Sequence, residues 1–433
     1  MLKNKNIANA GWIIGCKIIQ ALLGVVISML TARYLGPSQF GVINYAAAIV
    51  AFVAPIAKLG LTHVIVQEII YSPDDEGKIL GSSMMMSLIS SIFCIIGVIA
   101  FSIVANMNDK ETVIVCSLYS VLLIAQALEY VQYWFQAKLM SKYPSVVAVI
   151  VYVLISLYKA ILLFMKKDIY WFAISNAMDH LIIGIILLII YRNKSNQRLK
   201  FSLKWSKKLL SQSKYFIIPS MMVTVFAQTD KIMLKFMIDD IATGIYSAAS
   251  ACAGMTSFIF AAIIDSMRPT IIAYKKKDSS SYEMNICRLY SVIICLALAQ
   301  SLAMTFLAKP VIWILYGKKY FAAISVLRIV VWHTTFSYIG SVRNIWILAE
   351  GKQSCLWKIN FSGALANIVL NLILIPIWGI EGAAVASVIT QVFTNFIIGF
   401  VMKPIRYNNT LMIRSFQSKF LIDMVKMLIW KKS

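Results

Sequence analysis

Long apolar runs, broken by short polar segments, follow one another along almost the whole of this chain. Each run is about 20 residues long, which is enough for a helix to cross the hydrocarbon core of a membrane. The pattern predicts twelve spans, at residues 11–33, 42–64, 81–105, 112–136, 145–165, 169–191, 214–238, 243–267, 287–308, 321–347, 355–376 and 381–403. We therefore expect an all-α polytopic membrane protein.

The longest polar interruption, residues 191–214, divides the predicted spans six and six. Its lysines alternate with apolar residues, which is typical of a segment that lies on an anionic membrane surface. We predict an N-terminal six-helix bundle (1–191), a basic cytoplasmic linker (192–213), a C-terminal six-helix bundle (214–403) and a basic amphipathic cytoplasmic tail (404–433). Gly41 and Gly244 open similar small-residue segments, which favours two pseudo-symmetric bundles.

The basic residues behind the net charge of +23 are spread unequally over the two sides of the membrane. If the N-terminus is cytoplasmic, the inner loops and ends hold 27 lysines and arginines, whereas the outer loops hold seven. This asymmetry predicts that both termini are cytoplasmic. The same asymmetry explains the excess of basic residues, so no nucleic acid partner is needed to account for it.

Sequence motifs for catalysis and metal binding are scarce. The seven cysteines lie in the spans or at their ends without a Cys-x-x-Cys pair, so we interpret them as small apolar residues. No phosphate-binding loop or nucleophile elbow is present, and all outer loops are short. We predict no catalytic residue, no metal site and no enzyme. Of three distant histidines, His180 beside Asp179 is the candidate for proton coupling, and a hydrogen-bonded structural histidine is the alternative.

Several charged residues interrupt the predicted spans: Lys17, Lys58, Lys159, Asp230, Lys231, Lys235, Arg328 and Arg343. A charge at the bilayer centre costs about 2.5–3.5 kcal/mol or more, so this set indicates a water-filled cavity that holds an anion. Lysines can also snorkel to the interface, and we favour that for Lys159 and Lys235. Glu129 is expected to pair with loop lysines.

Three segments resemble a known family. Residues 31–41 (TARYLGPSQFG), 230–234 (DKIML) and 315–320 (LYGKKY) are similar to motifs of the polysaccharide repeat-unit flippases, which serve O-antigen and capsule synthesis. These flippases belong to a superfamily with multidrug-and-toxin extruders and the lipid II flippase.

The resemblance implies two six-helix lobes around a central cavity that opens to alternate sides of a bacterial plasma membrane. The implied cargo is an oligosaccharide repeat unit linked to undecaprenyl pyrophosphate, moved from the inner to the outer leaflet. The implied binding residues are Lys17, Arg33, Lys58, Asp230 and Lys231. A proton or sodium gradient, rather than a cofactor, is the implied driving force, and a polymerase and other glycan-assembly proteins are candidate partners beside the membrane lipids.

Three other functions remain open, one of which is a structural role in a glycan-assembly complex. An ion-coupled multidrug or toxin antiporter of the same fold would line its cavity with carboxylates. A membrane enzyme of glycan assembly would need a larger outer face than these loops provide.

Overall fold

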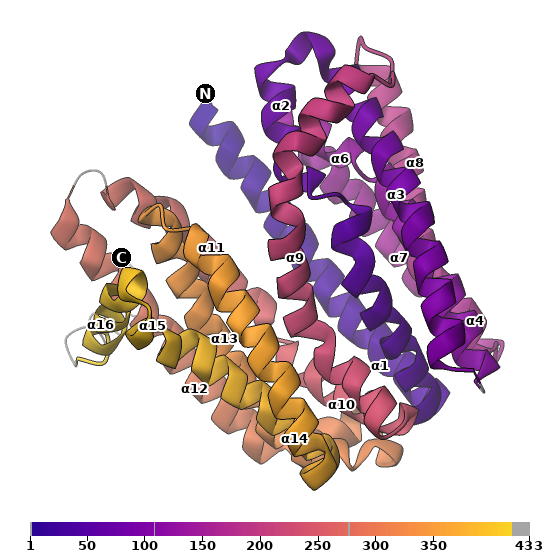
Figure 1. Cartoon of the computed structure of the whole chain (residues 1–433), viewed down its shortest axis with the longest axis vertical. Coiled ribbons are helices and arrows are strands. Elements are labelled where there is room, and N and C mark those ends of the chain that lie inside the picture. The colour runs from indigo at the N-terminus through magenta and orange to yellow at the C-terminus, as the bar shows by residue number, and fades with distance from the viewer. Residues whose placement is uncertain (1, 108, 276–277, 418–433) are drawn as a thin grey trace. The chain divides into compact units, whose positions relative to one another are not determined.

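The computed structural model describes residues 2–107, 109–275 and 278–417, without the side chains of residues 2–14, 17 and 18. The described residues form helices and turns, with no strand. They divide into two compact units, one of residues 1–235 with 239–244 and the other of residues 236–238 with 245–433. Figure 1 labels the helices of each unit, apart from α5.

The first unit contains nine α-helices. They are α1 (Leu2–Ala57), α2 (Ile65–Tyr71), α3 (Glu76–Ala105), α4 (Lys110–Ser120), α5 (Leu122–Leu128), α6 (Val131–Ala137), α7 (Lys142–Phe164), α8 (Ile169–Lys194) and α9 (Leu203–Met237) within the described residues. Short 3₁₀ turns, η1 (Leu61–His63) and η2 (Pro73–Asp75), flank α2.

The helices that follow form the second unit, and α10 begins in the first. They are α10 (Asp240–Gly254), α11 (Ser257–Lys275), α12 (Ser279–Leu315), α13 (Ala323–Ala349), α14 (Ser354–Val392), α15 (Ile398–Val401) and α16 (Arg406–Arg414). A π-helical turn, η4 (Phe393–Ile397), joins α14 to α15, and the 3₁₀ turns η3 (Lys318–Tyr320) and η5 (Lys403–Ile405) precede α13 and α16.

Each of the twelve predicted spans falls on helical structure, and the protein is a multi-pass membrane protein. Two long helices carry two predicted spans each, because α1 bends at Gly36 (φ 78°) and α14 bends at Gly379 (φ 58°), where glycine tolerates a positive φ. Eight described stretches are long and apolar enough to cross a membrane on their own. The spans predicted on α9 and α13 are outside that group, and both helices carry internal charges.

Two predicted spans are less regular than expected. The fourth, residues 112–136, is divided into α4, α5 and α6 by turns at Val121 and at Glu129–Tyr130, although the backbone angles of these residues stay in the right-handed helical region. The eighth is divided between α10 and α11.

The linker is shorter than residues 192–213, because α9 already begins at Leu203. Trp205 and Leu209 of α9 are buried in a core with α2, α3, α6 and α8. This packing assigns most of α9 to the first unit, so the boundary between the units lies beyond the six-and-six division of the spans.

The start of the predicted tail is folded against the second unit. Leu411 and Met412 of α16 are buried in the core formed by α11, α12 and α13, and the Ser291 hydroxyl donates to the Ser415 carbonyl (2.5 Å). The rest of the predicted amphipathic helix, residues 418–433, lies outside the described residues.

Candidate functional site

The first candidate site is built around the break that ends α1. Leu59 (φ 50°) and Gly60 (φ 63°) both adopt left-handed conformations directly after Lys58. A leucine in this region is strained, and such strain persists where the surroundings hold it, often at functional sites. The Tyr130 hydroxyl donates to the Lys58 carbonyl (2.8 Å), and α9 approaches so closely that a Cβ on Gly60 would lie 2.4 Å from the Ser213 carbonyl oxygen.

Lys58 opens into a cavity of about 660 Å³ within the first unit. Its walls come from α1, the α4–α5 segment and α9. The polar side chains that line it are those of Lys58, Thr62, Tyr119, Gln126, Ser220, Thr224 and Gln228. Lys58 is the one charged residue among the described lining residues, and no carboxylate lies among them. The cavity therefore has the electrostatic character that an anionic group needs.

Two glutamines of this cavity offer hydrogen-bond acceptors. The side-chain oxygens of Gln126 and Gln228 are buried and make no hydrogen bond to any described residue. A buried amide oxygen without a donor is costly unless water or a ligand supplies one. The cavity thus combines a cation with two acceptors for hydroxyl or amide hydrogens.

A chain of ionisable groups lies behind Lys58. The His180 ring nitrogen Nδ1 is 2.8 Å from the Glu129 carboxylate, and the Asp179 carboxylate is 3.9 Å from Nε2. Lys58 lies within electrostatic reach of both Glu129 and His180. Glu129 therefore contacts the predicted Asp179–His180 pair. From the sequence we had expected Glu129 to pair with loop lysines instead.

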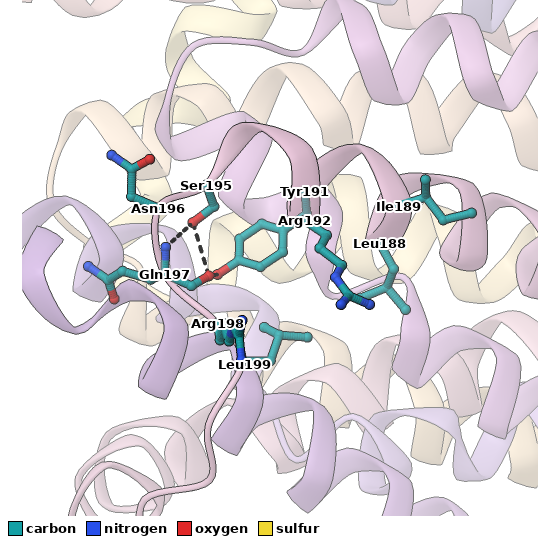
Figure 2. Close-up of a pocket in the computed structure, with 9 residues that line it drawn as sticks. All are labelled: Leu188, Ile189, Tyr191, Arg192, Ser195, Asn196, Gln197, Arg198 and Leu199. Atoms are coloured by element: carbon teal, nitrogen blue, oxygen red, sulfur yellow. Dashed lines mark hydrogen bonds between the residues drawn. The ribbon is translucent and has the colours of Figure 1, made fainter.

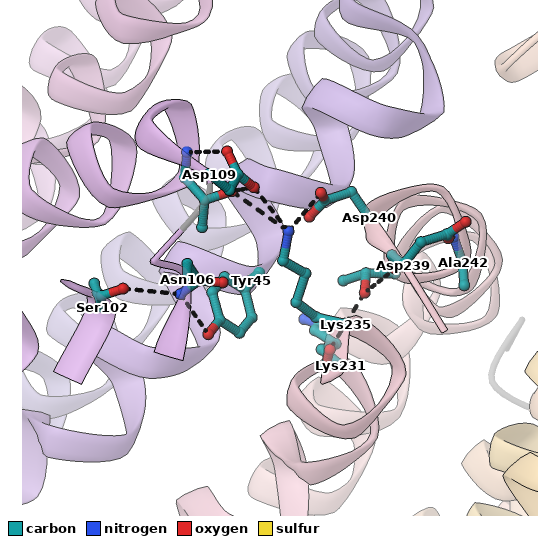
Figure 3. A network of polar contacts seen from close by, with 11 residues as sticks. Tyr45, Ser102, Asn106, Asp109, Lys231, Lys235, Asp239, Asp240 and Ala242 are labelled. Atoms are coloured by element: carbon teal, nitrogen blue, oxygen red, sulfur yellow. Dashed lines mark hydrogen bonds and ion pairs between the residues drawn. The ribbon is translucent and has the colours of Figure 1, made fainter. Parts of the chain in front are cut away.

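A second polar cluster lies where α9 ends (Figure 3). Lys235 Nζ is 2.5 Å from the Asp240 carboxylate and 3.1 Å from the Asp109 carboxylate, and its side chain is 11% exposed. Asp109 also caps α4 by accepting from the Thr112 backbone N–H (3.0 Å). Burial disfavours the charged Asp109 carboxyl, but the donors Thr112 and Lys235 outweigh it, so the pKa of Asp109 lies below its usual value. Lys235 is a bridging cation and not the interfacial anchor that we predicted.

Beside this cluster α1 and α10 cross at two glycines. A Cβ on Gly41 would lie 1.8 Å from the Asp240 carbonyl oxygen, and a Cβ on Gly244 would lie 1.9 Å from the Pro37 carbonyl oxygen. Only glycine permits this backbone approach. Gly41 and Gly244, which occupy matching positions in the sequence repeat, are therefore the points at which α1 and α10 contact each other.

The predicted anion-binding residues are not gathered at one place in the described part of the first unit. Lys58 lines the cavity, whereas Arg33 is exposed on the first part of α1, and Asp230 and Lys231 lie on α9 beyond the stretch that lines the cavity. Asp230 is buried and Lys231 is half-buried. The side chain of Lys17 lies outside the described residues.

The remaining charges in the spans have other local roles. Lys159 Nζ donates to the Asn176 side-chain oxygen (3.0 Å), which ties α7 to α8 and corrects its prediction as an interfacial anchor. In the second unit the buried Arg343 guanidinium donates to the Thr394 carbonyl in η4 (2.5 Å) and to the Asn344 side-chain oxygen (3.2 Å). Arg343 thus supplies a hydrogen-bond donor to a backbone carbonyl of an irregular turn. Arg328 is exposed.

Comparisons with known proteins place this fold among membrane transporters. The chain superposes on the lipid II flippase MurJ in its inward closed conformation with a TM-score of 0.72, at 15% identity over 95% of this chain and 92% of that one. It also superposes on an inward-facing multidrug resistance transporter of the MATE family with a TM-score of 0.68, at 14% identity over 92% of this chain and 96% of that one. At these identities the likeness shows the fold alone.

Sequence relatives point to polysaccharide synthesis. The capsular polysaccharide biosynthesis protein CapF of Staphylococcus aureus is 22% identical over 89% of this chain and 96% of its own length. An uncharacterised membrane protein of Methanocaldococcus jannaschii is 27% identical over 55% of this chain, and the match spans about half (49%) of that relative. The model of the polysaccharide biosynthesis protein family matches residues 7–275, which is more than half of the sequence. The resemblance carried by the three motifs is confirmed, and the chain belongs to the polysaccharide biosynthesis protein family.

Proposed function

We propose that this protein is a flippase for undecaprenyl-pyrophosphate-linked oligosaccharide repeat units. It carries them from the inner to the outer leaflet of a bacterial plasma membrane by alternating access, for synthesis of O-antigen, capsule or exopolysaccharide. The observation that carries the proposal is the cavity of the first unit. Among its described lining residues, Lys58 is charged and none is a carboxylate. The family membership and the MurJ-like fold support the same class of function.

The chemistry of the cavity suits the junction between a pyrophosphate and a sugar. A lysine ammonium supplies three charge-assisted donors to phosphate oxygens. Sugar hydroxyl or acetamido N–H groups are the donors that the Gln126 and Gln228 oxygens lack. Lys58 is proposed to bind the pyrophosphate, and the two glutamines are proposed to bind the first sugar.

A multidrug or toxin antiporter is the second candidate, because the fold also matches the MATE transporter. A cationic drug requires a carboxylate or an aromatic box in the cavity, and the described lining offers a lysine. The solved structures that the chain resembles are transporters and a flippase, which favours transport over an enzyme of glycan assembly. Both termini are proposed to be cytoplasmic, and a polymerase and other glycan-assembly proteins are proposed partners.

The direct test measures on which leaflet the lipid-linked repeat unit accumulates. In cells or vesicles without this protein, we expect the repeat unit to stay on the inner leaflet, protected from an externally added glycosidase or lectin. Restoring the protein should expose it. Equal exposure with and without the protein would exclude the flippase, whereas uptake of a cationic dye that depends on the protein would favour the antiporter.

The two cavity glutamines give a prediction about cargo recognition. Replacing both with leucine (Gln126→Leu with Gln228→Leu) removes two acceptors, each worth about 0.5–1.5 kcal/mol. We expect flipping of the native repeat unit to fall roughly tenfold, while the lipid pyrophosphate without sugar is handled as before. The leaflet assay with both lipids checks this, and an equal loss for both lipids would contradict sugar recognition.

His180 gives a prediction about energy coupling. Histidine is the side chain whose charge changes near neutral pH. This ring contacts the carboxylates of Glu129 and Asp179, and Lys58 lies within electrostatic reach. We propose that the cluster exchanges a proton during transport. A His180→Gln variant is expected to lose the dependence of flipping on an imposed proton gradient. Flipping measured in vesicles with the gradient set or collapsed checks it, and an unchanged dependence would assign coupling to another group.

A further inference from the structure

The segment between α8 and α9 is a fixed strap, which we define as residues 195–202. The Lys200 backbone N–H donates to the Gly77 carbonyl (3.1 Å), and the Gly77 N–H donates to the Gln197 side-chain oxygen (3.0 Å). The Ser202 N–H donates to the Ser82 hydroxyl (2.9 Å). A Cβ on Gly77 would lie 2.4 Å from the Arg198 carbonyl oxygen, so the strap lies directly against α3.

The strap and the end of α8 line an open pocket of about 550 Å³ (Figure 2). Tyr191 closes one side by donating from its hydroxyl to the Gln197 carbonyl (3.0 Å), and Ser195 bonds the same residue. Arg192 and Arg198 line the pocket, and Leu188 adds an apolar wall from α8. The pocket is thus preformed by backbone contacts, with two guanidinium groups and an apolar side.

The two arginines leave the pocket with an uncompensated positive charge. Arg192 and Arg198 are exposed, and neither forms an ion pair within the described residues. The acid that faces the strap, Glu76, is already engaged by Lys138 Nζ (2.7 Å) and by the Ser195 hydroxyl (3.0 Å). Paired guanidinium groups are well suited to a phosphate, because each presents planar N–H donors to two oxygens.

The pocket lies at the end of a membrane span. α8 is one of the stretches that can cross a membrane, and it ends at Lys194. Ile189 on α8 is 57% exposed, Phe201 in the strap is 58% exposed, and Leu203 at the start of α9 is 61% exposed. Exposed apolar side chains among cations are typical of a segment that rests on an anionic lipid surface.

We propose that this pocket binds one anionic phospholipid, with the phosphate between Arg192 and Arg198 and the start of an acyl chain along Leu188 and Ile189. The lipid is a bound component of the membrane and not the transported cargo, so the proposal stands apart from the proposed function. The two arginines favour a lipid with a net negative charge, because a choline headgroup would place its own cation between them.

The test compares the lipids retained by the purified full-length protein. Protein in detergent is incubated with phosphatidylglycerol or phosphatidylcholine, and bound lipid is counted by native mass spectrometry. We expect phosphatidylglycerol to be retained by the wild type, and retention to fall at least tenfold in the double variant Arg192→Gln with Arg198→Gln. The matched control, Lys204→Gln with Lys207→Gln, removes the same charge from exposed residues outside the pocket.

Three results would overturn the proposal. They are equal retention of both lipids by the wild type, undiminished retention by the arginine variant, or an equal loss in the lysine control. Inorganic phosphate is added in a further arm. Displacement of the lipid by millimolar phosphate alone would show a free-phosphate site without an acyl-chain contribution and would also contradict the proposal. Melting temperatures of both variants verify that the comparison is between folded proteins.

Discussion

Replacing Lys58 with methionine is expected to slow flipping of the lipid-linked repeat unit by roughly 10–100-fold. Lys58 is the charged residue among the described cavity-lining residues, and a charge-assisted hydrogen bond contributes about 1.5–3 kcal/mol. Methionine keeps the length and apolar stem of lysine and removes only the cation. Lys58→Arg restores the charge and should recover much of the rate.

The measurement is the leaflet assay at matched protein abundance. The control is Lys78→Met, because Lys78 is exposed and pairs with its helical neighbour Asp75 (2.7 Å), an interaction worth little at a surface. Flipping by Lys58→Met at the wild-type rate, or an equal defect in Lys78→Met, would show that the cavity cation does not bind the cargo. A normal melting temperature in Lys58→Met separates loss of binding from loss of folding.

The spans were predictable because lipid imposes a single rule on the chain. A helix that crosses the membrane must satisfy its own backbone and face lipid with apolar side chains, so hydropathy locates it. Bends were predictable only in part. Proline disrupts a helix, so Pro55 is a sequence signal for a bend near Lys58, but the left-handed turn at Leu59 and Gly60 also involves the close approach of α9 at Ser213.

The candidate site was less predictable, because rotation about a helix axis decides which residues meet. Glu129 and His180 are 51 residues apart, and their contact follows from the packing of the α5 end against α8, which a periodic pattern does not record. Gln126 and Gln228 are neutral residues that composition gave no reason to single out. Their proposed role rests on side-chain oxygens that are buried without a donor among the described residues, which the sequence does not show.

Lys235 was misinterpreted for a related reason. Its position near a span end favoured snorkelling, but both of its partners, Asp109 and Asp240, lie at the starts of other helices. The repeat of Gly41 and Gly244 was interpreted as a similarity between the two halves, but small residues also allow helices to pack closely. The structure shows such packing within the first unit, since each glycine accommodates a backbone carbonyl of the other helix.

Replacing Lys235 with methionine is expected to destabilise the protein by about 2 kcal/mol and to lower its melting temperature by several degrees. The change leaves two carboxylates, Asp109 and Asp240, facing each other without their shared cation. Removing one partner of a fully buried ion pair costs roughly 3–5 kcal/mol. The cost here is smaller because the Asp109 side chain is 37% exposed and water screens part of the repulsion.

The pH dependence of this loss has a definite sign. The pKa of Asp109 is lowered in the folded protein, so its contribution to the free energy of unfolding is present near neutral pH and is lost as the pH falls below about 4. The stability difference between wild type and Lys235→Met should therefore be largest near pH 7 and should shrink on acidification. Thermal unfolding in detergent at several pH values measures it.

Two further variants separate the ion pair from general effects at this end of α9. Adding Asp240→Asn to Lys235→Met removes one of the opposed charges and should recover part of the lost stability, although Asp240→Asn alone should destabilise. Lys110→Met changes a nearby exposed lysine and should melt like the wild type. If Lys235→Met melts like the wild type, or if the added Asp240→Asn recovers nothing, then Lys235 does not hold the start of α10 to the α3–α4 turn.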